Sequence, residues 1–229
     1  RSAEILLNLG RGLNNDLSSY LHPAFLSAPS TAPHTNKLRN PSIMSLYENK
    51  NKLEKENIKM NNNGLECEFV WHRAPMVDVE RQVKDKSVKR IFINGCFDCV
   101  HPGHFNAVRQ AKATFSEPGV DIVLIVGVHS TVGITGQKGP PVLDNDERID
   151  VIKSVKWVDE MVTLLPYMEM SPAFLDAIRA DYCVHGDDLP IIKGGGRGMY
   201  SASIDSDRCR IIKRTEGVST TNIIGRLLT

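Results

Sequence analysis

The sequence predicts an α/β fold in which a parallel sheet is flanked by helices, and three observations support this. From about residue 86 onward, short apolar runs alternate with segments of helical periodicity. One run, 122–128, is apolar throughout, as expected of a strand buried on both faces. The polar segments that look chemical come directly after strands, where ligands bind in open α/β sheets.

The elements follow in the order strand-helix-strand-helix-strand-helix-strand-strand-helix, which is typical of a parallel sheet wrapped by helices. Asn and Asp caps precede Ile149, Ile152 and Val155, which recur at helical spacing. Ser171 suits an N-cap and Pro172 the first helical position. The expected strands are 89–95, 120–128, 158–165, 181–186 and 209–214, and the expected helices are 101–115, 144–155, 171–180 and 219–228.

Composition restricts the classes of function. The chain has 229 residues, is 41% hydrophobic and 24% charged, and carries a formal net charge of +1. That balance predicts no nucleic-acid partner, and the longest apolar run is too short for stable membrane insertion. Five cysteines, an odd number in a chain that needs no disulfides, favour reduced thiols and a cytoplasmic location. The composition does not exclude a small anionic ligand.

Two domains of different character are expected. Residues 22–42 mix Pro, Ser, Thr and Asn without apolar periodicity, and residues 48–63 are a polar Asn/Lys/Glu tract. Such composition buries too little apolar surface to offset chain entropy. We therefore expect a low-complexity, mostly disordered extension over 1–85 and a folded domain over 86–229.

His101 and His104 bracket a Pro-Gly at the start of the expected helix 101–115. Two ligands are too few for a zinc site, and outside the stretch 94–112 no Cys or His pair has zinc spacing. Two ordinary, hydrogen-bonded histidines would be the default for a short motif. The pair, however, follows a strand and a turn at Gly95 and opens a helix, where free N–H groups and the helix dipole favour phosphate.

The cysteines Cys96 and Cys99 have the C-x-x-C spacing of a thiol redox pair. The flanking residues typical of such pairs are absent, and the segment leads directly into His101. We interpret both cysteines as turn residues and keep a thiol redox protein as a distant alternative.

A second anion site is expected near the C-terminal end, in "KRTEGVSTTNIIGRLL". Arg214 ends a strand, Gly217 permits a tight turn, and Ser219 begins a helix. A well-capped helix would explain the hydroxyls without any ligand. Arginine beside several hydroxyls and free helix N–H groups is nevertheless suited to a triphosphate.

Two glycine-containing segments are expected to be loops. Lys138 lies between Gly136 and Gly139, so a mobile loop could deliver its cation to a phosphoryl group, although a solvated lysine is the simpler interpretation. Residues 194–200, "GGGRGMY", lack the ending of a phosphate-binding P-loop, and we expect a substrate-side loop there.

Taken together, H-x-G-H at 101–104 and "RTEGVSTT" at 214–221 resemble the cytidylyltransferase family. H-x-G-H alone occurs in many nucleotidyltransferases, whereas the second motif indicates CTP. Within the family, further segments resemble the enzymes that act on phosphoethanolamine, over about residues 88–228. These segments are "KGPPV" at 138–142, "KWVDE" at 156–160, "YCVHGDD" at 182–188, and Gly196-Arg197 with Tyr200.

The resemblance implies a Rossmann-like H-x-G-H nucleotidyltransferase fold and transfer of a cytidylyl group from CTP to phosphoethanolamine. It implies Mg²⁺ as a companion of CTP, and no dedicated metal ligands in the protein. The implied catalytic residues are His101, His104, Lys138 and Arg214. The implied nucleotide-binding residues are Gly95, Cys96, Phe97, Gly103, Gly186, Asp187, Thr215, Gly217, Val218, Ser219 and Thr220. The implied substrate-binding residues are Asn94, Asp98, Lys138 and Tyr167.

The chain departs from the family pattern in two ways. Asn94 stands where such enzymes commonly carry an acid that would attract an ammonium group. The family also usually has two tandem domains, so either a second cytidylyltransferase domain lies beyond this sequence or the protein works with a single domain. A second cytidylyltransferase domain or a homodimer is the expected partner. A phosphocholine cytidylyltransferase and a non-catalytic CTP-binding half of a tandem protein remain as alternatives.

Overall fold

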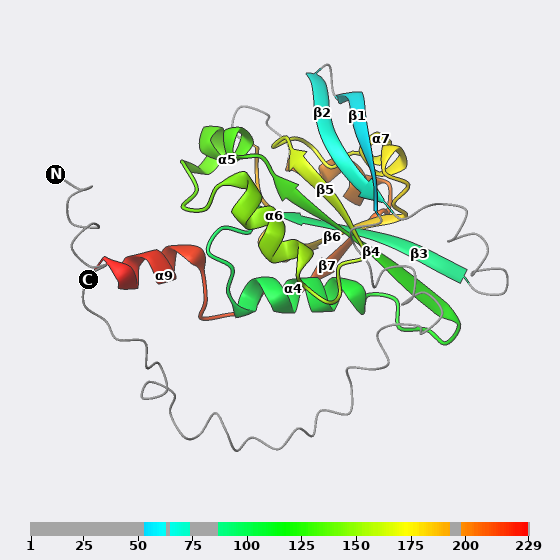
Figure 1. Cartoon of the computed structure of the whole chain (residues 1–229). Coiled ribbons are helices and arrows are strands. Elements are labelled where there is room, and N and C mark those ends of the chain that lie inside the picture. The colour runs from blue at the N-terminus through cyan, green and yellow to red at the C-terminus, as the bar shows by residue number, and fades with distance from the viewer. Residues whose placement is uncertain (1–52, 63–64, 74–86, 193–197, 229) are drawn as a thin grey trace. The chain divides into compact units, whose positions relative to one another are not determined.

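The computed structural model describes residues 53–62, 65–73, 87–192 and 198–228. Within them lies one seven-stranded sheet in the order β1-β2-β5-β4-β3-β6-β7 (Figure 1). Its strands are β1 (Glu54–Asn62), β2 (Leu65–Arg73), β3 (Ser87–Gly95), β4 (Val120–His129), β5 (Glu160–Leu165), β6 (Tyr182–Gly186) and β7 (Cys209–Ile212). The helices are α4 (Pro102–Lys112), α5 (Thr131–Lys138), α6 (Asn145–Lys153), α7 (Pro172–Ala177), α8 (Ser201–Asp205) and α9 (Thr220–Leu227).

The strands β3 to β7 form the parallel part of the sheet. From the central β3 the chain moves outward to β4 and β5, then returns to the other side of β3 for β6 and β7. The connections change direction between β3 and β6, and ligands bind at such a point, outside the carboxyl ends of the strands. The predicted α/β fold is therefore confirmed, and its topology marks one edge of the sheet for a site.

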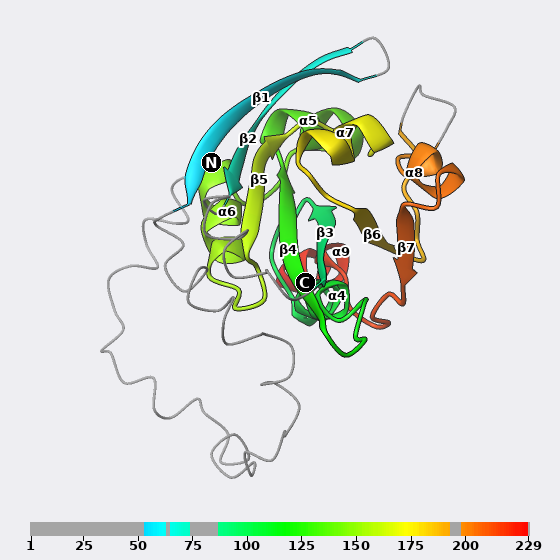
Figure 2. The same ribbon diagram turned by 90° about the vertical axis from the view of Figure 1, so that its right-hand side faces the viewer.

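Two hydrophobic cores lie on opposite faces of the sheet, because alternate residues of a strand point to opposite sides. Ile91 and Ile93 of β3 pack in one core with residues of α4 and α6, whereas Phe92 packs in the other core with residues of α7 and β2. Figure 2 shows these helices on their two sides of the sheet. Burial on both faces explains the continuous apolar run of β4.

The predicted boundary at residue 86 is wrong for the hairpin of β1 and β2. β1 pairs antiparallel with β2, and β2 pairs antiparallel with β5, so the hairpin extends the sheet. Cys67, Phe69 and Trp71 alternate along β2 and are buried, which is the strand period that the polar composition around them concealed. The polar residues expected to be disordered form the outer strand β1. The rest of the predicted extension lies outside the described residues.

The sequence prediction also missed two helices. The expected mobile loop around Lys138 is the helix α5, which Ser130 caps by accepting a hydrogen bond from the Gly133 N–H at 3.1 Å. The glycines lower helix propensity and concealed it. α8 follows the expected loop 194–200, of which 194–197 lie outside the described residues. No helix in the described part of the chain is long and apolar enough to cross a membrane.

Candidate active site

A cleft of about 500 Å³ lies at the carboxyl ends of β3, β4 and β6. Residues from the ends of α5 and β7 and from the starts of α4 and α9 also line it. All predicted site residues line the cleft except Asp187 and Gly217. Asp187 instead accepts a hydrogen bond from the Arg214 N–H at 3.1 Å, and Gly217, with φ of 75°, forms the turn that leads to α9.

The two histidines of the H-x-G-H sequence cap α4 together. The Gly103 N–H donates to His101 Nδ1 at 3.2 Å, and the His101 N–H donates to His104 Nδ1 at 3.3 Å. Both Nδ1 atoms therefore act as acceptors, so the proton of each neutral ring is on Nε2. The sequence motif thus fixes two Nε2–H donors at a helix N-terminus.

Both rings are neutral at physiological pH. Burial, reinforced by His101, lowers the pKa of His104 to about 4. Burial and the positive charge of Arg214 lower the pKa of His101. The ring centroids lie 3.9 Å apart, and Phe97 packs against His104. The pair can therefore hydrogen-bond to an anion without first being protonated.

Lys138 ends α5 and lines the cleft beside Tyr167. Burial raises the pKa of the Tyr167 hydroxyl, and the neighbouring Lys138 ammonium acts in the opposite direction. Asp98 fixes the segment that follows the lysine, because its carboxylate accepts from the N–H groups of Val142 and Leu143, each at 2.9 Å. Asp98 was predicted to bind substrate, but in this structure both its carboxylate oxygens accept hydrogen bonds from the segment that follows Lys138.

The segment that begins α9 lies against the H-x-G-H turn. Thr220 Oγ1 donates to the Asp98 carbonyl at 3.0 Å, and Asn106 Nδ2 donates to Thr215 Oγ1 at 2.9 Å. Ser219 caps α9 as expected, accepting from the Asn222 N–H at 3.1 Å. Two helix N-termini therefore meet at one cleft, which suits a ligand with several phosphates.

Arg214 lies at the mouth of the cleft and pairs with Asp188. Its Nη1 donates to the carboxylate at 2.8 Å, and about half of each side chain is exposed, 52% and 48%. Exposed ion pairs of this kind contribute little to stability. The guanidinium can exchange this partner for a phosphate at small cost.

The sequence analysis missed Arg148, which is fully buried beneath the cleft. Its Nη1 donates to the Cys96 carbonyl at 2.8 Å and to the His129 carbonyl at 2.7 Å. Other nitrogens of the guanidinium reach Thr131 and the start of α6. One side chain thus joins the ends of β3 and β4 to two helices. No local pattern indicated this, since an arginine in an amphipathic helix is usually exposed.

The sequence analysis also missed the floor of the cleft around Asn94. His129, His185 and Tyr200 line it together with the predicted Asn94 and Tyr167. His129 and Tyr200 both hydrogen-bond to Asn94. A histidine that ends a strand after an apolar run was the signal that could have been noticed.

The cysteines of the C-x-x-C sequence do not form a redox centre of the usual kind. Burial raises the pKa of the Cys96 and Cys99 thiols, whereas a redox pair needs a thiolate with a lowered pKa. Both thiols are free, and both lie in the turn between β3 and α4. The interpretation as turn residues agrees with this geometry.

Comparison with known proteins shows to which family the chain belongs. Over 144 residues the chain is 40% identical to ethanolamine-phosphate cytidylyltransferase of Dictyostelium discoideum and 42% identical to that of Mus musculus, matching 63% of this chain and 38% and 34% of those proteins. It is 33% identical over 156 residues to choline-phosphate cytidylyltransferase A of Homo sapiens, 68% of this chain and 41% of that protein. The matched part therefore spans about two fifths or less of these relatives. The family model "Cytidylyltransferase-like" matches residues 92–226, more than half of the chain, and the chain belongs to that family.

Proposed function

We propose that this chain transfers a cytidylyl group from CTP to phosphoethanolamine, giving CDP-ethanolamine and pyrophosphate. The observation that carries the proposal is the pair of neutral Nε2–H donors of His101 and His104, fixed beside the N-terminus of α9 in one cleft. The choice of substrates is supported by the names of the relatives with the higher identity.

In the proposed reaction, an oxygen of the acceptor phosphate attacks the α-phosphorus of CTP. The new bond forms between that oxygen and the α-phosphorus, and the bond from the α-phosphorus to the bridging oxygen breaks. Pyrophosphate leaves with the bonding electron pair. No covalent enzyme intermediate is needed, so positioning and charge stabilisation supply the catalysis.

The side chains around the cleft divide this work. The two imidazoles donate to phosphate oxygens whose negative charge grows in the transition state, and they are already oriented before substrate arrives. Lys138 supplies a positive charge at the side of the acceptor phosphate. Arg214 exchanges Asp188 for phosphate oxygens of CTP. Removing one preorganised donor of this kind typically raises a barrier by about 3 kcal/mol, which is ~100-fold or more in rate.

Mg²⁺ would fit this cleft as part of the metal–CTP complex. Among the described residues, no group of three or more His, Cys, Asp or Glu side chains could hold a metal ion. The two carboxylates that line the cleft, those of Asp98 and Asp188, are already bound to protein groups. The ion would be held by triphosphate oxygens and water, and would neutralise charge on the triphosphate.

A cytoplasmic location is a further part of the proposal, supported by five cysteines that are all in the thiol form. We also infer that the activity operates beside a second copy or a second domain of related fold; the matched part covers 38% and 34% of the two relatives.

The proposed activity can be tested with a product assay. The protein is incubated with CTP, Mg²⁺ and phosphoethanolamine, and products are followed by ³¹P NMR, with phosphocholine in a parallel reaction. We expect CDP-ethanolamine and pyrophosphate in equal amounts and much slower reaction with phosphocholine. Faster reaction with phosphocholine would identify the acceptor as choline-based. Binding of CTP by calorimetry without product from either acceptor would overturn the proposed activity.

A further inference from the structure

The floor of the cleft is a hydrogen-bonded set formed by Asn94, His129 and Tyr200. Asn94 Nδ2 lies 2.8 Å from His129 Nε2, and the Tyr200 hydroxyl donates to Asn94 Oδ1 at 2.6 Å. Asn94 and His129 are buried, and the Tyr200 side chain is almost fully buried. All three line the cleft, so the set forms part of a binding surface as well as part of the core.

The direction of each hydrogen bond in this set follows from the backbone carbonyl oxygens that His129 faces. His129 Nδ1 faces the carbonyl oxygens of Leu165 at 3.3 Å and Pro166 at 3.2 Å, which can only accept. Nδ1 therefore carries the proton and Nε2 is an acceptor. The amide nitrogen of Asn94 must face Nε2, which directs its oxygen to the Tyr200 hydroxyl.

Counting hydrogens shows what the floor offers to a ligand. One Asn94 amide hydrogen goes to His129, and the amide also faces Met199 Sδ at 3.9 Å. The hydroxyl hydrogen of Tyr200 goes to Asn94. The remaining capacity consists of lone pairs on Asn94 Oδ1 and on the Tyr200 hydroxyl oxygen. The floor therefore accepts hydrogen bonds from a ligand and has no hydrogen left to donate.

The floor also carries no formal charge. Burial lowers the pKa of His129 to about 4 and raises that of Tyr200 well above its usual value, so both are neutral at pH 7. The carboxylates among the residues that line the cleft are those of Asp98 and Asp188, and both have protein partners. The rings of Tyr167 and His185 pack at a tilt against the floor, with centroids 4.8 Å from His129 and 4.6 Å from Tyr200, respectively.

The position of Lys138 indicates which end of the acceptor faces this floor. Lys138 adjoins Tyr167, and the Tyr167 ring packs against His129. An acceptor whose phosphate binds at Lys138 therefore directs its opposite end toward Asn94. This step rests on the proposed function, because it takes the acceptor to be a phosphorylated amino alcohol.

We propose that Asn94 determines acceptor specificity by recognising N–H donors rather than positive charge. A primary ammonium has three N–H groups and can donate to the lone pairs of Asn94 and Tyr200. A quaternary trimethylammonium carries the same charge and has none. It would leave the remaining lone pairs of Asn94 Oδ1 and the Tyr200 hydroxyl without a donor, and sites built to hydrogen-bond a substrate reject analogues that lack the donor by large factors.

A substrate series on the unmodified protein tests this directly. Phosphoethanolamine and its N-methyl, N,N-dimethyl and N,N,N-trimethyl derivatives share one positive charge and lose N–H groups one at a time. The uncharged 3,3-dimethylbutyl phosphate has the shape of the last member. We expect kcat/KM to be about 100-fold or more lower for the trimethyl than for the dimethyl compound, and similar for the trimethyl compound and its uncharged isostere.

The variant Asn94→Leu removes the amide acceptor with little change in volume. We expect it to lower kcat/KM for phosphoethanolamine by at least tenfold, to change that for phosphocholine little, and to leave KM for CTP unchanged. Asn57→Leu, the same change at an exposed position of β1, should alter none of these. If Asn94→Leu does not fold, the substrate series on the unmodified protein still decides.

Two results separate the ways in which this could fail. If trimethyl and primary amines react equally, or if the uncharged isostere is far worse than the trimethyl compound, the floor recognises charge or shape and the inference is wrong. If no acceptor yields a CDP product, the proposed function itself has failed.

Discussion

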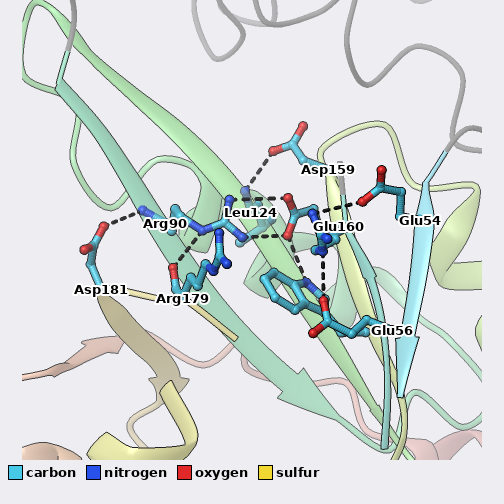
Figure 3. A network of polar contacts seen from close by, with 10 residues as sticks. Glu54, Glu56, Arg90, Leu124, Asp159, Glu160, Arg179 and Asp181 are labelled. Atoms are coloured by element: carbon cyan, nitrogen blue, oxygen red, sulfur yellow. Dashed lines mark hydrogen bonds and ion pairs between the residues drawn. The ribbon is translucent and has the colours of Figure 1, made fainter. Parts of the chain in front are cut away.

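The two ends of the parallel sheet carry similar polar groups, but these groups differ in whether protein partners use all their hydrogen bonds. At the amino ends of the strands, Arg90 Nη2 donates to Glu160 at 2.7 Å (Figure 3). Trp71 Nε1 donates to the same carboxylate at 3.0 Å. Arg90 also reaches the Arg179 carbonyl and, through its backbone N–H, Asp181, each at 2.7 Å. This network joins β2, β3 and β5 to the segment that precedes β6.

At the carboxyl ends, the groups are held in position but keep capacity for a ligand. His101 and His104 use their Nδ1 atoms for the helix cap and keep their Nε2–H groups. Arg214 has one exposed and replaceable partner. Location in this α/β sheet therefore decides what a polar group does. At the amino ends these partners stabilise the fold, and at the carboxyl ends His101, His104 and Arg214 keep donors for a ligand.

The largest expected effect concerns the amino-end network. Glu160 is fully buried, so Glu160→Ala leaves Arg90 and Trp71 without their shared acceptor. Breaking a buried pair in this way costs about 3–5 kcal/mol, which urea unfolding would measure. Glu68→Ala, at an exposed pair with Lys59, should cost less than about 1 kcal/mol. Equal effects of the two changes would contradict a stabilising role for the network.

The next effect belongs to the cleft. His104→Ala removes one oriented Nε2–H donor and should lower kcat by ~100-fold or more, equivalent to about 3 kcal/mol of barrier. Because His104 is partly exposed, the unfolding free energy should change much less than in Glu160→Ala. Steady-state assays with CTP, normalised to folded protein, would measure this. Turnover within twofold of that of the unmodified protein would contradict the catalytic role of His104.

A smaller effect links the cleft floor to stability through pH. Burial depresses the pKa of His129 to about 4 in the folded state, whereas an unfolded histidine titrates near 6.5. The unfolded state therefore binds more protons below pH 6.5, so stability is complete above that pH and falls as pH decreases toward 4. At pH 5 this group should cost about 2 kcal/mol relative to pH 7.5.

The control for the pH effect is a protein without that ring. His129→Gln, although less stable at every pH, should lose about 2 kcal/mol less between pH 7.5 and pH 5 in urea unfolding. The same pH dependence in both proteins would show that His129 is not the group responsible.

The smallest effect concerns Asp98, which connects the two motifs. Asp98→Asn places an amide NH₂ toward one of the two N–H groups that the carboxylate now accepts, so the segment after Lys138 loosens. Losing one hydrogen bond to a charged group costs about 1.5 kcal/mol, and we expect roughly a tenfold lower kcat. Asp150→Asn, at an exposed position of α6, is the matched control and should be silent.

Local sequence patterns predicted the elements whose signals lie in neighbouring residues, but they did not predict contacts between distant parts of the chain. The helix start at the H-x-G-H segment, the Ser171 start of α7 and the buried run of β4 depend on neighbouring residues, so their sequence signals were sufficient. β2 was missed because polar residues surround its alternating apolar ones. The strand β5, which joins the hairpin to the rest of the sheet, lies about ninety residues further along the chain, as the bond from Trp71 to Glu160 illustrates.

The site was predictable to the same degree and for the same reason. The residues of the two motifs could be named, since each motif combines a turn with a helix start. Arg148 and the contacts of His129 and Tyr200 with Asn94 could not, because their partners come from other strands and loops. Motif residues were visible in sequence, whereas the residues that hold them in place required the fold.

The most direct test of the cleft's state is ¹⁵N NMR of histidine-labelled protein at pH 7, recorded with and without CTP. We expect His101 and His104 to be neutral, with Nδ1 unprotonated and Nε2 protonated, and we expect CTP to shift the Nε2 signals most strongly. Imidazolium signals, protonated Nδ1 atoms, or no response of either ring to CTP would contradict this expectation.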